Sequence, residues 1–276
     1  MMKRILSTYV FRNQRLSTAL LSDMELAGIT HVELFCAPSH FDYRSPQAVR
    51  ELADWLDTHD LKVHSVHSPT SREMSAKREN SIPISLCDFE HSRRLDAVDE
   101  VKHVLEIAER IPFQFLVQHL GASREGTDPR RQDAAMNSLE HLCVFAKQRG
   151  VTIALENTPG DFSSPAHLRQ FIVDTHLRDL RLCFDTGHAH LEEGVGAGFD
   201  AMRDFVATTH IHDNHGERDE HLFPYSGTID WGAALRALRS ANEDLPLVLE
   251  VREQAADSQP LERATAAFVR LERAIQ

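Results

Sequence analysis

Six apolar segments of the chain end in a side chain that can bind a metal ion. These six residues are His67, His119, Glu156, Asp185, His210 and Glu250. Imidazole and carboxylate groups are common ligands of zinc and manganese ions, and they also act as general acids and bases. A carboxylate at the end of a buried strand needs a cation or several hydrogen-bond donors to offset its desolvation. The pattern therefore indicates metal-assisted acid/base chemistry.

Two short motifs add further candidate ligands. Asp185 and His188 are three residues apart in a tight turn after an apolar segment, and Asp219 and His221 alternate in a polar loop. Either spacing lets both side chains of the pair face one cavity. Such pairs are also common on solvated loops, so their meaning depends on where the fold places them.

Four other polar residues lie near the candidate ligands. We expect His212 and His215 to support other groups or to face solvent. Glu33 either contacts a substrate hydroxyl or closes a polar layer inside the fold. His64 alternates out of phase with His67, so we expect it to face the helices.

The candidate ligands follow predicted strands in a chain that alternates strands and helices. The predicted strands span residues 4–10, 30–36, 61–67, 113–119, 151–157, 180–185, 208–213 and 247–252. The predicted helices span residues 16–27, 46–58, 93–109, 129–149, 165–175, 199–206, 230–240 and 260–275. Eight such units of about 35 residues match the usual length of a (β/α)8 TIM barrel. The carboxyl ends of the strands in a barrel meet at one mouth, which would collect the candidate ligands there.

Helix boundaries support this α/β assignment. Ser45, Asp128 and Ser164 each precede a proline, as is typical of a helix start, and Gly28 and Gly150 follow predicted helix ends. An open doubly wound sheet is the alternative, but no glycine-rich fingerprint follows the first strand. No linker or change of composition divides the chain, so we interpret residues 1–276 as a single TIM-barrel domain.

Composition restricts the class of partner. Lys and Arg number 30 against 42 Asp and Glu, which gives a formal net charge of −12 and argues against a nucleic-acid partner held by bulk charge. The chain has 17 histidines, and its four scattered cysteines form no disulfide framework. It shows neither a signal peptide nor an apolar run long enough to span a membrane. We therefore expect a cytoplasmic protein with no membrane partner.

The ordered motifs HSP, QHLG, LENTP, FDTGHAH, HIHDN, DEHL, SGTIDW and LEVRE resemble the xylose isomerase-like TIM-barrel superfamily over the whole chain. This superfamily holds sugar phosphate isomerases and epimerases together with endonuclease IV. The isomerase branch implies one divalent ion, typically manganese, held by Glu156, Asp185, His210 and Glu250. The endonuclease branch implies three zinc ions, with ligands at those four positions and at His67, His119, His188, Asp219 and His221. The resemblance therefore implies one to three Mn²⁺ or Zn²⁺ ions per chain as the cofactor.

The first functional hypothesis is isomerisation or epimerisation of a small-molecule sugar or sugar phosphate. A metal ion would stabilise the enediolate formed when a C–H bond next to a carbonyl is ionised. Glu156 and Glu250 approach from different sides of the barrel, so one could remove a proton and the other return it. His188 would orient a substrate hydroxyl. The resemblance also allows a homo-oligomer, because dimers and tetramers are common in that family.

The alternative hypothesis is endonuclease IV-like hydrolysis of a phosphodiester at abasic DNA sites. Glu156 would then bridge two zinc ions and be a poor base. Acidic stretches at residues 192–193 and 217–220 argue against a DNA duplex as substrate. The few basic candidates would be solvated or would bind a substrate phosphate or acid, and they are Arg72, Lys77, Arg78, Arg93 and Arg94. A barrel with a purely structural metal is a third possibility.

Overall fold

The computed structural model describes residues 3–72, 82–122, 125–252 and 259–275. Eight parallel strands form a closed barrel in the order β1-β10-β9-β8-β7-β6-β3-β2. They are β1 (Ile5–Ser7), β2 (His31–Phe35), β3 (Lys62–His67), β6 (Phe115–His119), β7 (Thr152–Glu156), β8 (Arg181–Asp185), β9 (Val206–Ile211) and β10 (Val248–Leu249). The predicted TIM barrel is thus confirmed. Strands β4 (Ser71–Arg72) and β5 (Ile82–Pro83) form a separate antiparallel pair.

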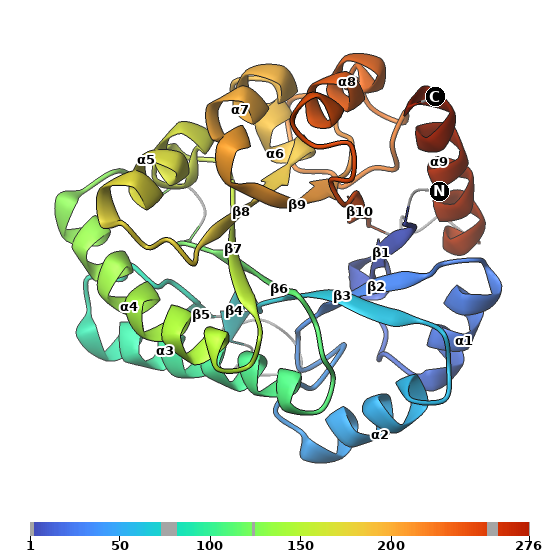
Figure 1. Cartoon of the computed structure of the whole chain (residues 1–276), viewed down its shortest axis with the longest axis horizontal. Coiled ribbons are helices and arrows are strands. Elements are labelled where there is room, and N and C mark those ends of the chain that lie inside the picture. The colour runs from blue at the N-terminus through green and yellow to red at the C-terminus, as the bar shows by residue number, and fades with distance from the viewer. Residues whose placement is uncertain (1–2, 73–81, 123–124, 253–258, 276) are drawn as a thin grey trace.

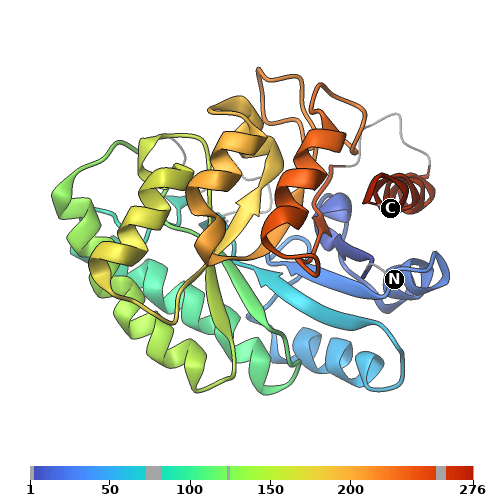
Figure 2. The same ribbon diagram turned by 45° about the horizontal axis from the view of Figure 1, so that its top comes forward.

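The helices lie outside the ring of strands, as Figures 1 and 2 show from two directions. They are α1 (Thr18–Leu26), α2 (Pro46–Leu56), α3 (His91–Leu105), α4 (Pro129–Lys147), α5 (Pro165–Thr175), α6 (Thr186–Leu191), α7 (Val195–Met202), α8 (Trp231–Ala241) and α9 (Pro260–Ile275). Two predicted helices, residues 165–175 and 260–275, match the observed bounds. None of the helices within the described residues is both long and apolar enough to cross a membrane.

Local chemistry explains where several helices begin. The Ser45 and Asp128 side chains accept hydrogen bonds from the first turns of α2 and α4, and a proline follows each of them. Gly28 and Gly150 have φ angles of 82° and 70°, the left-handed conformation that glycine adopts without strain. The boundaries that the sequence predicts at these positions are confirmed.

The elements after β8 differ from the prediction. A single helix is expected over residues 199–206, but the structure has α6 and α7, which begin earlier. Helix α6 begins directly after Asp185, whose Oδ1 accepts a hydrogen bond of 2.7 Å from the backbone of His188. Threonine and glycine at the start of α6 are weak helix formers, so the sequence gives little indication of this turn. The aspartate is therefore a helix cap as well as a candidate ligand.

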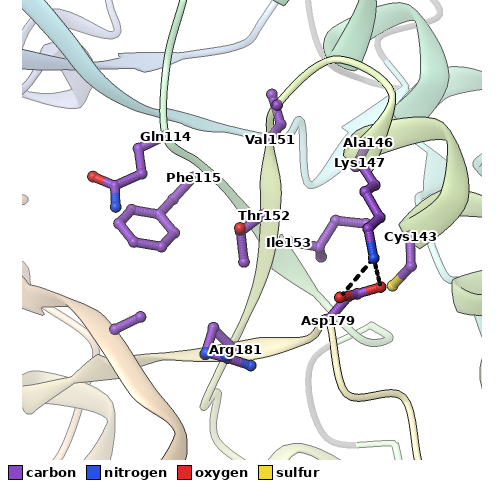
Figure 3. A pocket seen from close by; sticks show the side chains of 12 residues that line it. Gln114, Phe115, Cys143, Ala146, Lys147, Val151, Thr152, Ile153, Asp179 and Arg181 are labelled. Atoms are coloured by element: carbon purple, nitrogen blue, oxygen red, sulfur yellow. Dashed lines mark hydrogen bonds and ion pairs between the residues drawn. The ribbon is translucent and has the colours of Figure 1, made fainter.

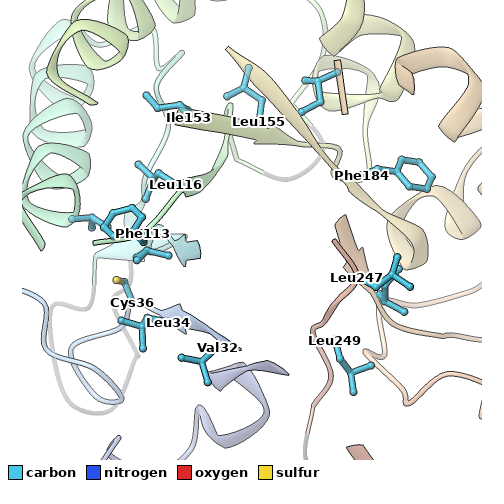
Figure 4. Close-up of a cluster of buried hydrophobic side chains, with 14 of the residues drawn as sticks. Val32, Leu34, Cys36, Phe113, Leu116, Ile153, Leu155, Phe184, Leu247 and Leu249 are labelled. Carbon is cyan, nitrogen blue, oxygen red and sulfur yellow. The ribbon is translucent and has the colours of Figure 1, made fainter. Parts of the chain in front are cut away.

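The two faces of the strands pack against different surroundings. Outward side chains such as Leu116, Ile153, Leu155 and Phe184 belong to the large core between strands and helices (Figure 4). Inward side chains in the lower half of the barrel form a second apolar cluster. Its members are Phe115, Val117, Ala154 and Cys183, with Ala207 beside them.

The expectation that His64 faces the helices is wrong. Its Nε2 lies 3.3 Å from the Thr208 hydroxyl, and its ring packs against Phe115 inside the barrel. The pairing of β2 with β3 is irregular, because Val32 pairs with Val63 whereas Glu33 pairs with Ser65. The pairing skips His64, which disrupts the simple alternation of side chains on which the prediction relied.

Candidate metal centre

The barrel brings the predicted strand-end residues together at one mouth. Strands β3, β6, β7 and β8 end at His67, His119, Glu156 and Asp185, respectively. His210 lies in β9 beside Asp185, and Glu250 follows β10 directly. Parallel strands in a barrel deliver their carboxyl ends to the same side, so positions distant in sequence become neighbours.

Four of these residues form what we call the central group. Its members, Glu156, Asp185, His210 and Glu250, are buried and offer ligand atoms that all lie within 4.8 Å of one another. His210 Nδ1 lies 3.1 Å from Glu156 Oε1, 3.4 Å from Glu250 Oε2 and 3.8 Å from Asp185 Oδ2. Three carboxylates and one imidazole thus converge on one small volume.

The central group has the properties of a cation site. Glu156 Oε1, Asp185 Oδ2 and His210 Nδ1 are buried and make no hydrogen bond of ordinary geometry within the described residues. Unpaired polar atoms and clustered carboxylates are costly inside a protein, so such atoms are normally paired or coordinate a metal. A divalent cation would satisfy all three atoms and offset the negative charge. The residues therefore fit a metal ion.

A second group consists of His67, His119 and Glu156, and it shares Glu156 with the central group. Nε2 of His67 and Nε2 of His119 lie 3.2 Å and 3.1 Å from Glu156 Oε2. Oε1 of the same carboxylate faces His210. Glu156 can therefore serve the central group with one oxygen and the second group with the other.

A third group lies on the side of the mouth formed by α6 and the loop between β9 and α8. Asp219 Oδ2 lies 3.0 Å from His221 Nε2 and 3.6 Å from His188 Nε2. His212 joins these residues, and the four offer ligand atoms within 4.8 Å of one another. All nine residues that the resemblance implies as ligands are thus distributed over three adjacent groups.

Hydrogen bonds outside the groups orient the imidazole rings. Nδ1 of His67, His188 and His221 lies 2.7 Å, 2.9 Å and 3.1 Å from a backbone carbonyl oxygen. A carbonyl oxygen only accepts, so each Nδ1 carries a hydrogen, and Nε2 is the nitrogen that can bind a metal once any proton on it is displaced. In each case Nε2 is the atom that faces a group. This arrangement is typical of metal-binding histidines.

Glu33 orients His210 in the same way. The glutamate is fully buried, accepts a hydrogen bond of 2.8 Å from Ser65, and lies 3.1 Å from His210 Nε2. His210 Nδ1 is thereby directed into the central group. Burial raises the pKa of Glu33, but the charge and hydrogen bond of His210 lower it overall. Of the two roles expected for Glu33, the structure supports the polar layer inside the barrel.

The charges of the mouth are strongly interdependent. Burial raises the pKa of Glu156, but the nearby His210 and His119 hold it well below its ordinary value. Burial lowers the pKa of His67, but the hydrogen bond and charge of Glu156, together with other carboxylates, raise it to about 9. Without a metal, these shifts favour the ionised carboxylate of Glu156 and the protonated imidazole of His67. Metal binding would displace such protons.

The remaining polar candidates that the structure describes have partners outside the three groups. His215 is exposed and pairs with Glu220 at 2.8 Å, as expected of a solvated residue. Arg72 pairs with Asp96 and Glu100. Arg93 pairs with Glu90 and Arg94 contacts the Asp88 carbonyl, whereas Lys77 and Arg78 lie outside the described residues.

Two further residues lie at the mouth: His212, which was expected to support other groups or to face solvent, and Tyr9, which sequence reasoning missed. His212 is fully buried in the third group, and its alternation with His210 in HIHDN was the available signal. Tyr9 follows β1, packs against the His221 ring at 4.9 Å, and accepts hydrogen bonds from Arg12 and Arg252. No motif marks Tyr9.

A small cavity of about 150 Å³ opens beside His188 and is lined by residues such as Thr158 and Asp161.

Comparison with known proteins agrees with the resemblance found in the sequence. A family model described as "Xylose isomerase-like TIM barrel" matches residues 21–271. The chain is 37% identical over 231 residues to "Uncharacterized protein y4fM" of Sinorhizobium fredii, covering 77% of this chain and 74% of that protein. It is 25% identical over 222 residues to the 3-dehydro-D-guloside 4-epimerase of Escherichia coli, covering 71% and 82% of the two chains.

A solved structure also shares the fold. The crystal structure of IOLI protein with a binding zinc atom superposes with a TM-score of 0.78 at 17% identity, covering 99% of this chain and 98% of that chain. The likeness extends over the complete barrel and its helices. At this identity it establishes a common fold.

Proposed function

Since the chain belongs to the xylose isomerase-like TIM barrel family, we propose that it is a metal-dependent isomerase or epimerase of a sugar or sugar phosphate. The observation that carries this proposal is the central group, in which three buried ligand atoms have no hydrogen-bond partner among the residues that the structure describes. The group lies at the mouth where barrel enzymes bind their substrates. The activity of the Escherichia coli relative supports a sugar as the substrate class.

The donor set suits a borderline divalent cation. Glu156, Asp185, His210 and Glu250 offer carboxylate oxygens and one imidazole nitrogen, which favours Mn²⁺ or Zn²⁺ over a soft metal. When bound, the ion supplies Lewis-acid polarisation of the oxygen atoms of a ketose or aldose. The family resemblance allows one ion in the central group or up to three in the whole mouth.

Glu156 and Glu250 are the proposed acid/base pair. Strand β7 carries Glu156 and β10 precedes Glu250, with β8 and β9 between them in the barrel. A sugar seated over the mouth would present its reacting carbon to carboxylates from two directions. One glutamate removes the proton next to the carbonyl, and the other returns a proton to the enediolate. Return to the opposite face gives epimerisation, and return to the neighbouring carbon gives isomerisation.

His188 is the proposed substrate-orienting residue. Its Nδ1 is held 2.9 Å from the Asn157 carbonyl oxygen, so the direction of its ring is fixed. The residue lines a cavity of about 150 Å³ that also includes Asn157, the neighbour of Glu156 in the sequence. With an ion in the central group alone, a substrate hydroxyl placed there would be positioned against Nε2, which lies 3.6 Å from Asp219. If the third group also holds an ion, Nε2 would be a metal ligand instead and would not orient the hydroxyl.

A second candidate function is endonuclease IV-like phosphodiester hydrolysis. The observation that favours it is the sharing of Glu156 between the central and second groups, because a bridging carboxylate suits two adjacent ions. The charge of −12 and the exposed acidic residues Glu192 and Glu217 oppose a DNA partner. We therefore rank sugar chemistry first.

Metal removal tests the proposal. Protein purified without chelator would be analysed for metal content, stripped with a chelator, and reloaded with Mn²⁺ or Zn²⁺ before assays on a panel of ketoses and their phosphates. We expect bound divalent metal, loss of turnover after stripping, and recovery after reloading. Turnover that persists in fully stripped protein would contradict the proposed role of the central group.

A further inference from the structure

We propose that His212 is a fourth metal ligand, which with His188, Asp219 and His221 forms a closed zinc site in the third group. The inference goes beyond the proposed reaction and holds whether or not the substrate is a sugar. The resemblance implies only three ligands here. The structure places a third imidazole among them, and this changes what the site can do.

The geometry of the third group supports four ligands. His212 Nε2 lies 3.9 Å from Asp219 Oδ1, while Asp219 Oδ2 lies 3.0 Å from His221 Nε2 and 3.6 Å from His188 Nε2. All four residues offer ligand atoms within 4.8 Å of one another. Three imidazoles and one carboxylate are a donor set that zinc accepts in tetrahedral coordination.

His212 has no other satisfactory partner. Its side chain is fully buried, and neither ring nitrogen makes a hydrogen bond of ordinary geometry within the described residues. Nε2 lies 3.0 Å from Asp185 Oδ1, which is ion-pair distance without hydrogen-bond geometry. An imidazole buried without a hydrogen-bond partner is costly. Coordination through Nε2 would remove part of that cost.

The surroundings hold the His212 ring in place. It stacks on His221 with ring centroids 4.0 Å apart and an interplanar angle of 17°. On another side it lies against Gly187, where a Cβ atom would overlap the ring. The glycine of the DTGH turn thus makes room for His212. A motif expected to present Asp185 and His188 therefore also accommodates a further candidate ligand.

Four protein ligands would make this a closed site. Catalytic zinc sites keep a coordination position for water or substrate, whereas structural sites fill all four positions with protein atoms. A closed third group would not generate a metal-bound nucleophile. Asp219 and His221 come from the loop between β9 and α8, so the ion would tie this loop to His188 in α6 and to His212, the residue that follows β9. The Asp219 side chain is 37% exposed, so the group borders solvent on that side.

Cobalt spectroscopy tests the coordination number directly. The full-length double variant Glu156→Gln/Glu250→Gln would weaken the central and second groups while leaving the third group intact. We expect one Co²⁺ to give the intense visible bands of four-coordinate cobalt, and the spectrum to remain unchanged when azide is added. Azide binds cobalt only where a coordination position is open.

Substitution of His212 is the second arm of the test. In the same background, His212→Asn should reduce Co²⁺ affinity by roughly 100-fold or more, because even outer partners of metal ligands contribute about 10–100-fold. The remaining spectrum should become sensitive to azide. His215→Asn is the matched control: His215 is exposed on the same loop and pairs with Glu220, so neither property should change.

An azide-sensitive spectrum in the protein that retains His212 would overturn the proposal, as would unchanged affinity and spectrum in His212→Asn. Circular dichroism would show whether His212→Asn folds. If it does not, azide sensitivity of the parent decides the coordination number, and Asp219→Asn confirms that the observed ion occupies the third group. None of these readouts depends on turnover of a sugar, so failure of this proposal is distinguishable from failure of the proposed function.

Discussion

The two ends of the barrel interior are built from the same strands but have opposite chemistry. On β7, inward-facing Ala154 belongs to the apolar lower cluster, and Glu156, two residues later, belongs to the central group. Strand β8 repeats the pattern with Cys183 and Asp185. The change from apolar to charged takes place within one layer of side chains. Inside the barrel, apolar packing thus occupies the lower end and the candidate ligands occupy the mouth.

Cavity size does not identify the reactive end. A pocket of about 500 Å³ lies at the amino ends of β6 to β8, beside α4, and includes Gln114, Thr152 and Arg181 (Figure 3). Its principal polar contact is an ion pair between Lys147 and Asp179 at 3.0 Å. The cavity beside His188 is smaller, at about 150 Å³, but includes one of the candidate ligands. The proposed site is therefore marked by convergent donor atoms rather than by the volume of a cavity.

Removing a charge from the mouth should have the largest effect. Glu156→Gln and Glu250→Gln should each reduce turnover by about 10²–10⁴-fold or more, because a proton-transferring group is lost. Glu250→Gln should also weaken metal binding. Steady-state rates and elemental analysis would measure both effects, with exposed Glu217→Gln as the control. Near-normal turnover in either variant would refute the assigned roles.

Truncation at the lower end should reduce stability without removing the metal. Phe115 is buried in the lower cluster, so Phe115→Ala should reduce the free energy of unfolding by about 3–5 kcal/mol. Urea denaturation would measure the loss, and elemental analysis would show unchanged metal content in the folded variant. If the variant lost its metal while retaining its stability, the two ends would not be separable in this way.

We expect His64 to make the free energy of unfolding fall at acidic pH. Burial lowers its pKa to about 4 from 6.5, so the unfolded chain binds this proton more readily than the folded protein between these values. Stability conferred by neutral His64 is therefore present above pH 6.5 and is lost as the pH falls towards 4. The shift corresponds to about 3 kcal/mol. His64→Asn should flatten this part of the stability profile, and identical acid profiles for the two proteins would contradict the prediction.

The smallest effect is expected at the surface pocket. The Lys147 and Asp179 side chains are 71% and 57% exposed, so water and salt screen their attraction. Lys147→Ala should change the free energy of unfolding by less than about 1 kcal/mol and leave metal content unaltered. Urea denaturation at low and high salt would measure it. A larger loss would mean that this pocket contributes more to stability than its exposure suggests.

Much of the fold was predictable because strands, helices and their caps have local signals. The barrel follows from the alternation of strands and helices, and the convergence of the strand-end ligands follows from known barrel geometry. The caps Ser45 and Asp128 follow from their residue types and the prolines after them. The position of His64 did not follow, because an irregular strand pairing depends on the partner strand as well as on local sequence.

The burial of His212 was also missed. Its environment is set by His221 and Gly187, which are distant in sequence and adjoin it only after folding. The role of Glu33 likewise depends on a contact with His210, 177 residues away. Residue type and spacing identified the candidate ligands, whereas the residues that support them required the folded structure.

The most direct test of the central claim is solvent isotope exchange measured beside DNA cleavage. Metal-loaded protein would be incubated in D₂O with a panel of ketoses and their phosphates, and separately with an abasic duplex. The account predicts metal-dependent deuterium incorporation at a carbon next to the carbonyl, abolished in Glu156→Gln and Glu250→Gln, without nicking of the duplex. Robust nicking with no deuterium in any sugar would contradict it.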